Sequence, residues 1–509
     1  MRSTIIILFI SVSNFFHSSA QDSIALHYSK SLSTNKIQND IVILSSDNME
    51  GRDTGSKGQK LAAQYICQQF INAGVNNPNG NKDRSGYFQN FPIYKKEQAN
   101  AEIQTFDKVF KNYEDILISG FTNYSKDNMD LVFLGTAPDT SYINKNFSNK
   151  AVLFLSTNLY AAAIKSNDIA QTSKAKLVLF CNPNKNSQYK ELIEKGKTIS
   201  ARGMNLKSEM NNNFNPFDSI GSAKAFTKYK NRMRTYQGAI SNPVACALLQ
   251  IKPKRLKQIL ETNQMNKTEQ KICKFTFNFD LKYKEVNTEN VLAFLPGTNK
   301  NKEILVISAH YDHIGKKDGE IFNGANDNAS GTAAIIEIAR KFQEANDNGH
   351  KTKRSILFIA FTGEEKGLCG SKYFVDNPPF PLSNIVGNLN LDMLGRHDEL
   401  NDTTDYIYLL GTNHLKPKLK VISDSINKIS TKLRLDYKYD TPDNFLYQAS
   451  DQASFVKHGI PAVFYFNGLH ADYHKASDTA EKIDFQAVNR VSQLVFLTAW
   501  ELANVVVPF

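Results

Sequence analysis

Five acid or imidazole side chains in the second half of the chain follow segments that are typical of β-strands. They are His310, Asp327, Glu365, Asp392 and His474. Each comes just after an expected strand or in the loop that enters the next helix, and ligands of open α/β sheets bind at this edge. Taken singly, each residue has a structural explanation, such as an acid favoured at a helix start. Five at the strand ends of one sheet indicate a shared site.

The types of these side chains indicate which metal they would hold. Imidazole and carboxylate groups without thiolates are typical of a catalytic zinc site, whereas structural zinc sites usually contain cysteine clusters. Two histidines and three carboxylates exceed the needs of one ion. We therefore expect two Zn²⁺ ions about 3.5–4 Å apart that share one carboxylate, as in paired-metal hydrolases. Such ions lower the pKa of a shared water and polarise a scissile carbonyl.

The neighbours of the expected ligands have chemistry of their own. Glu364 is expected to act as the general base, taking a proton from water and passing it to a leaving amine. Asp312 follows His310 by two residues, and residues i and i+2 share one face of a strand. We therefore expect Asp312 to orient that imidazole from behind. His313 and His470 either line the substrate cleft or pack behind it.

The elements that must position these residues alternate regularly from residue 290 onward. Strands are expected over 304–308, 355–361, 389–391, 406–410 and 462–466, with helices over 329–342 and 485–505. This alternation predicts an α/β fold with a sheet that is covered by helices on both faces.

The first half of the chain has a different pattern of apolar and polar residues. Helical apolar spacing over 37–44 and 58–73 encloses a polar, glycine-containing loop. Short strand-like runs separated by polar stretches rich in Asn and Lys then predict an inserted β-rich domain. The expected division is a signal peptide over 1–20, the start of the catalytic domain over 21–114, the insert over 115–264 and the remaining catalytic domain over 265–509.

Composition excludes several classes of protein. The 509 residues carry a net charge of +11, with 41% apolar and 22% charged residues, which is typical of a soluble globular protein with two or three folded units. The basic excess is diffuse and no stripe of aromatic and basic residues occurs, so nucleic-acid binding is not expected. The five cysteines leave at least one thiol free, and neither their pairing nor the oligomeric state can be deduced.

The N-terminus has the pattern of an export signal. Arg2 precedes an apolar stretch over 5–10, and small residues at 18–20 form a cleavage pattern before Gln21. The apolar stretch is too short to span a bilayer, so we expect a periplasmic or secreted protein without stable membrane insertion.

Five motifs occur in an order that resembles one known family. They are His310-x-Asp, Asn326-Asp-Asn-Ala-Ser-Gly, Gly363-Glu-Glu-x-Gly-Leu-x-Gly-Ser, Asn390-x-Asp-Met and Tyr473-His-x-x-Ser-Asp-Thr. The set resembles the co-catalytic zinc exopeptidases, which include bacterial leucyl aminopeptidases and glutamate carboxypeptidase II, with the transferrin receptor as a non-catalytic relative. The loop over 50–56 matches as well, and the insert resembles a protease-associated domain.

This resemblance implies an aminopeptidase that hydrolyses N-terminal residues from peptides, with a role for each site residue. Asp327 would bridge the two ions, His310 and Asp392 would complete one site, and Glu365 and His474 would complete the other. Glu364 would be the base, and Tyr447 would stabilise the oxyanion. Gln452 stands where the family often has His, which affects the pocket but none of the ligands.

Three alternatives stay open. A carboxypeptidase needs a cationic group for the terminal carboxylate, and Arg396 follows Asp392 closely. A glutaminyl cyclase shares the sheet and a similar site, but the resemblance ties that reaction to loop tryptophans, and the single tryptophan here is Trp500 in the expected terminal helix. A non-catalytic, receptor-like relative would have broken ligands, whereas all five are intact. Aminopeptidase activity is favoured, and the side-chain preference and the role of the insert stay open.

Overall fold

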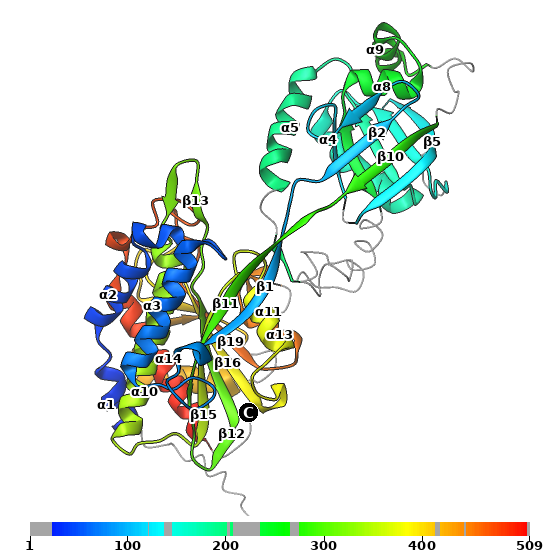
Figure 1. The fold of residues 1–509 in the computed structure, drawn as a ribbon. Coiled ribbons are helices and arrows are strands. Elements are labelled where there is room, and N and C mark those ends of the chain that lie inside the picture. The colour runs from blue at the N-terminus through cyan, green and yellow to red at the C-terminus, as the bar shows by residue number, and fades with distance from the viewer. Residues whose placement is uncertain are drawn as a thin grey trace, which may run out of the picture.

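The structure is a computed structural model that describes residues 23–120, 122–136, 145–200, 204–206, 235–264, 274–412, 418–441 and 444–505. The expected signal peptide over 1–20 lies outside these residues. The described chain forms two lobes, each built on its own large β-sheet and joined by two long strands (Figure 1). Within the described residues, no helix combines the length and apolar character that crossing a membrane requires.

The larger lobe contains a nine-stranded mixed sheet in the order β18-β17-β19-β16-β12-β15-β11-β1-β8. Its parallel centre comprises β19 (Ala462–Phe466), β16 (Ile385–Asp392), β12 (Lys300–His310) and β15 (Arg354–Phe361). The flanking strands are β18 (Arg434–Asp436), β17 (Tyr406–Leu410), β11 (Tyr283–Leu295), β1 (Phe88–Lys96) and β8 (Met204–Asn205). A small hairpin, β13 (Gly315–Lys317) and β14 (Glu320–Phe322), follows β12.

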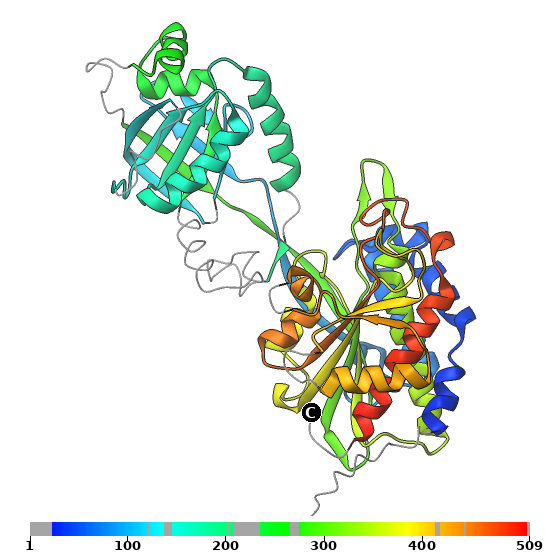
Figure 2. The ribbon, with the colours of Figure 1, turned by 180° about the vertical axis from the view of Figure 1, so that it is seen from behind.

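Helices cover both faces of this sheet, because successive strand residues point to opposite sides. Leu305 and Ile307 of β12 belong to one apolar core, and Ile304 and Val306 to another. The first core lies under α1 (Ser23–Lys30), α2 (Thr34–Leu44), α3 (Lys57–Ala73), α10 (Gly331–Asp347), α12 (Lys418–Ile429) and α14 (Phe485–Asn504). The second lies under α11 (Cys369–Asp376) and α13 (Gln452–Lys457), which lie to the left of the sheet in Figure 2, opposite α1, α2 and α14. The predicted α/β fold is confirmed.

The smaller lobe contains an eight-stranded sheet in the order β3-β2-β10-β5-β6-β7-β9-β4. The strands are β2 (Asn100–Gln104), β3 (Val109–Lys111), β4 (Ile116–Ser119), β5 (Tyr124–Thr136), β6 (Ala151–Leu155), β7 (Leu177–Cys181), β9 (Tyr236–Ile240) and β10 (Lys274–Asp280). Its helices are α4 (Leu159–Ser173), α5 (Asn186–Ser200), α8 (Asn242–Leu249) and α9 (Pro253–Thr262). Separate apolar cores lie on its two faces.

This second sheet draws strands from residues 100–280, a wider span than the 115–264 predicted for the insert. The additional strands β2, β3 and β10 alternate buried with more exposed residues. Such half-buried strands lack the continuous apolar run by which the central strands were identified.

Two long strands connect the lobes. β1 and β11 pair antiparallel from Phe88 opposite Val291 to Lys96 opposite Tyr283. Within this connection the ring of Phe91 stacks on Tyr373 of α11, with centroids 4.4 Å apart. The connecting strands therefore contact the helix that follows Glu364 and Glu365.

Candidate metal centre

The five predicted ligands come together at the carboxyl edge of the parallel strands. His310 is the last residue of β12 and Asp392 the last residue of β16. Asp327 lies in the turn η5 (Ala325–Ser330) that enters α10, and the peptide bond after it is cis. Glu365 follows β15, and His474 lies in the loop after β19. The edge predicted from sequence is therefore where these side chains meet.

Their polar atoms divide into two groups that share Asp327. His310 Nε2 lies 3.3 Å from Asp392 Oδ1 and 3.4 Å from Asp327 Oδ1. His474 Nε2 lies 3.2 Å from Asp327 Oδ2 and 3.2 Å from Glu365 Oε1. The two oxygens of Asp327 thus face different histidines, which is the disposition of a bridging carboxylate.

These separations fit the residues to zinc. With zinc–ligand distances of about 2.0–2.1 Å, donor atoms of a tetrahedral site lie about 3.3 Å apart. The Glu365 side chain is only 8% exposed, and its Oε1 faces the imidazole nitrogens of His313 at 2.8 Å and His474 at 3.2 Å. A buried carboxylate of this kind is costly unless it is paired or coordinates a metal. The donor set and its burial therefore both suit a divalent cation.

Glu364 lies beside the first group, within 4.8 Å of the nearest ligand atoms of His310 and Asp392. Burial raises the pKa of Glu364 well above its ordinary value; His310 opposes this shift, and the carboxylates of Glu365 and Asp392 add to it. The pKa of the buried Asp451 is also raised, to about 7, chiefly by desolvation. The centre thus concentrates more negative charge than its own protein groups neutralise.

Asp312 contacts His310 chiefly through its backbone. The His310 Nδ1 atom lies 3.1 Å from the backbone oxygen of Asp312 and 3.8 Å from its carboxylate. The carboxylate instead accepts hydrogen bonds from the Glu364 backbone nitrogen (3.1 Å) and the Thr54 hydroxyl (2.7 Å). The strand ends at His310, so the alternation assumed for residues i and i+2 no longer applies. Asp312 therefore links the loop that carries Glu364, the expected base, to the loop over 50–56.

Further polar groups hold the ligand loops. Asp478 accepts hydrogen bonds from the backbone nitrogens of Asn326 and Asp327, and the Ser450 hydroxyl donates to Asp392 Oδ2 at 2.9 Å. These contacts orient Asp327 and Asp392, two of the expected ligands, without the help of a bound ion.

Arg52 was not singled out by the sequence, although it lies in the matched loop over 50–56. Its guanidinium is fully buried and donates to the backbone oxygens of Leu44, Tyr311, Asn323 and Gly324. Burial lowers its pKa to about 10, and the nearby carboxylates, Asp327 foremost, oppose that shift. A positive charge therefore lies beneath the acidic centre and joins the segments that carry its ligands.

Tyr447 lies in an apolar cluster with Met393, Tyr408 and Phe466, among others. Its hydroxyl oxygen lies 3.1 Å from the position that a β-carbon on Gly411 would take. Burial raises the Tyr447 pKa to about 12, so the phenol is neutral at neutral pH. Its role at the oxyanion stays a prediction.

Gln452 supports this region from behind. Its amide donates to the Tyr447 backbone oxygen, and its side-chain oxygen accepts from Asn390 Nδ2. Gln452 therefore links the Tyr447 turn to the strand that ends in Asp392.

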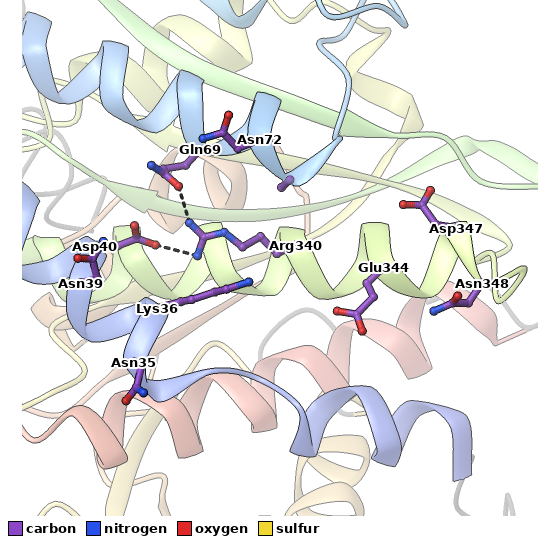
Figure 3. A pocket seen from close by; sticks show the side chains of 11 residues that line it. Asn35, Lys36, Asn39, Asp40, Gln69, Asn72, Arg340, Glu344, Asp347 and Asn348 are labelled. Carbon is purple, nitrogen blue, oxygen red and sulfur yellow. Dashed lines mark hydrogen bonds and ion pairs between the residues drawn. The ribbon is translucent and has the colours of Figure 1, made fainter.

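Two hollows of similar size differ in their surroundings. One, of about 670 Å³, is lined by Tyr439, Phe445, Phe466 and Leu469 together with the acids Asp398 and Glu399, and lies along the strand and loop that lead to His474. The other, of about 620 Å³, is a polar groove between α2, α3 and α10 (Figure 3). In the second groove Arg340 is held by Asp40 and Gln69, so its charge is already paired. The first hollow is therefore the better candidate for a substrate side chain.

Comparison with known proteins agrees with the arrangement. Residues 290–499 match peptidase family M28. A probable zinc metalloprotease of Pyrenophora tritici-repentis (strain Pt-1C-BFP) is 27% identical over 263 residues, covering 43% of this chain and 52% of that protein. A probable leucine aminopeptidase 1 of Trichophyton verrucosum (strain HKI 0517) is 30% identical over 228 residues, covering 42% of this chain and 58% of that protein. The matched region spans about half the length of these relatives.

The fold is also similar to that of a solved structure over nearly the whole chain. An aminopeptidase from Aneurinibacillus sp. strain AM-1 superposes with a TM-score of 0.51 at 20% sequence identity, covering 95% of this chain and 98% of that one. This likeness concerns the fold alone. Over residues 290–499, where the predicted motifs gather at one sheet edge, the chain matches peptidase family M28, the co-catalytic zinc exopeptidases.

Proposed function

We propose that this protein is a zinc-dependent aminopeptidase that hydrolyses N-terminal residues from peptides. The observation that carries the proposal is the division of Asp327 between two groups, with one oxygen facing His310 and the other facing His474. The names of the relatives, a probable zinc metalloprotease and a probable leucine aminopeptidase, support the choice of metal and reaction. We propose two ions per chain, because each group offers three donor atoms when Asp327 is shared.

Each side chain then has a task. His310 and Asp392 would hold one ion, His474 and Glu365 the other, and Asp327 both. When bound, zinc polarises the scissile carbonyl and lowers the pKa of water.

Glu364 would take the proton from the attacking water and pass it to the leaving amine. Its buried position raises its pKa, which favours a group that must both accept and donate a proton. Asp312 and Thr54 would hold the Glu364 loop in register.

The charges favour an aminopeptidase over a carboxypeptidase. Arg396, the cation that a carboxypeptidase could use, has one guanidinium nitrogen 2.9 Å from Asp472 Oδ2. That ion pair weakens its availability for a substrate carboxylate.

The remaining expectations extend this proposal. We propose that the chain is exported by its N-terminal signal and acts on peptides in the periplasm or outside the cell. The smaller lobe would be the protease-associated-like insert that the sequence predicts. Its attachment through β1 and β11, which contact α11, gives it a route by which to influence the centre.

The test uses the chain from Gln21 onward, stripped with chelator and supplied with zinc stepwise. Aminoacyl reporters and blocked peptides are followed at each step, together with bound zinc. We expect activity to need two zinc ions and a free α-amino group. Glu364→Gln should lower kcat by roughly 10²–10⁴-fold with zinc content unchanged. Glu344→Gln, at the groove of Figure 3, is the matched control and should behave like the wild type.

Two results would contradict the proposal. Cleavage of N-blocked peptides with a free C-terminus would identify a carboxypeptidase instead. Zinc binding without turnover of any peptide would exclude a peptidase, and cyclisation of N-terminal glutamine would then be measured.

A further inference from the structure

We propose that His313 is a direct ligand of the second zinc ion, in addition to Glu365, His474 and Asp327. This inference rests on the zinc binding of the proposed function. His313 stands outside the five motif ligands, and the sequence left it between lining the cleft and packing behind it. The structure gives it a definite position inside the centre.

The distances place the His313 imidazole among the donor atoms. Its Nδ1 lies 2.8 Å from Glu365 Oε1 and 3.7 Å from Asp327 Oδ2. His474 Nε2 lies 3.2 Å from the same two oxygens. All four separations lie near the about 3.3 Å that separates donors around a tetrahedral zinc ion. The His313 and His474 rings, 5.7 Å apart and 69° from parallel, approach the two carboxylates from different directions.

The His313 nitrogens have no polar partner outside the centre among the described residues. The ring is completely buried; its Nδ1 approaches only the carboxylates of Glu365 and Asp327, and its Nε2 has no hydrogen-bond partner among the described residues. Buried polar groups are normally satisfied, because an unmet nitrogen costs free energy. A cation between Nδ1 and the two carboxylates would satisfy the nitrogen that points into the centre.

The backbone holds His313 in this position. Its nitrogen donates to the Arg52 carbonyl at 3.2 Å, and the chain pairs there with Asp53. Gly324 packs against the imidazole, since a β-carbon at 324 would come within 2.5 Å of His313 Cδ2. The space for the ring is therefore built by segments far apart in sequence.

A fourth ligand makes the two sites unequal. Four protein donors are typical of closed zinc sites, and three of sites that keep an open position. The group with His313 and His474 has four, and the group with His310 and Asp392 has three. We therefore expect zinc to fill the site of His313 and His474 first and to bind there more tightly than at the site of His310 and Asp392.

The alternative role is a hydrogen bond from Nδ1 to Glu365, and one substitution separates the two. His313→Asn places an amide N–H near the position of Nδ1 but removes the zinc ligand, whereas His313→Ala removes both. His470→Asn is the matched control, because His470 is also a buried histidine of this region and its Nδ1 accepts from the Asp472 backbone nitrogen.

Zinc affinity is measured by competition with a chromophoric chelator. We expect two classes of site in the wild type. Both His313→Asn and His313→Ala should weaken the tight class by about 10³-fold or more, beyond the roughly 10–100-fold loss typical of an outer partner. His470→Asn should stay within tenfold. Retention of the tight class by His313→Asn would overturn the assignment.

X-ray absorption at the zinc edge gives a readout that needs no variant. Wild-type protein loaded with one equivalent should show two imidazoles bound to the ion. A single imidazole would overturn the assignment of His313 while leaving the proposed function intact. Absence of any zinc binding by the wild type would instead refute the proposed function, and this inference with it.

Discussion

Replacing Arg52 with Met should destabilise the larger lobe by about 3–5 kcal/mol. The methionine side chain fills much of the same space but cannot donate hydrogen bonds. The guanidinium, fully buried, donates to backbone oxygens of Leu44, Tyr311, Asn323 and Gly324. These four oxygens belong to the end of α2, the exit of β12 and the loop that leads to Asp327.

The magnitude follows from counting what each oxygen loses. Gly324 also accepts a hydrogen bond from the Ala329 nitrogen at 3.2 Å, so it keeps one partner. The other three lose the guanidinium donor, at about 1–3 kcal/mol for each unsatisfied buried group. Burying the Arg52 cation is itself unfavourable, since burial lowers its pKa to about 10. Replacement with Met removes this unfavourable burial, which offsets part of the loss. The net destabilisation of about 3–5 kcal/mol is of the size expected when one partner is removed from a buried charged network.

The single tryptophan makes the assay specific to this lobe. Trp500 lies in α14 and packs against Phe342 and Phe496, away from the smaller lobe. Its fluorescence in urea, measured in chelator so that zinc adds no stability, reports unfolding of the larger lobe alone.

Two further variants complete the test. Arg52→Lys should fall between Arg52→Met and the wild type, because Lys keeps the charge but lacks the planar fork. Arg84→Met removes an exposed arginine of the same lobe and should change stability by no more than about 0.5 kcal/mol. An Arg52→Met protein within about 1 kcal/mol of the wild type would refute the reasoning.

Three other outcomes are expected. Thr54→Val removes the hydroxyl donor to Asp312 and should lower kcat about tenfold with bound zinc unchanged, whereas Thr54→Ser should restore it; equal kcat for the Val and Ser variants would contradict this. Leu469→Asp should lower kcat/KM for a leucyl reporter about tenfold more than for an alanyl one, because it replaces an apolar side chain of the hollow with a charged one; equal losses would show that the hollow does not receive the side chain. Burial and the charge of Arg396 lower the His470 pKa to about 4, below the about 6.5 of an unfolded histidine, so the unfolded chain binds more protons between these values. The stability of the metal-free wild type relative to His470→Asn should therefore fall as the pH drops from about 6.5 to about 4, which the difference between their urea midpoints measures.

Much of the larger sheet could be predicted from the sequence because its central strands are buried on both sides. The expected strands over 406–410 and 462–466 coincide with β17 and β19. Continuous apolar runs bounded by polar loops mark such strands clearly. The alternating strands β2 and β10 were missed, because a half-buried strand is recognised only by its pairing with neighbours.

The sequence by itself determined which five residues meet and at which edge, because side chains placed at the ends of parallel strands share one edge whatever the remaining packing. Only the tertiary structure decided how Asp327 divides its oxygens, and that His310 contacts the Asp312 backbone rather than its carboxylate. It alone placed His313 among the ligands and Arg52 beneath them. These features depend on side-chain directions and on contacts between segments more than two hundred residues apart, which are set by the packing of the whole lobe and leave no local pattern in the sequence.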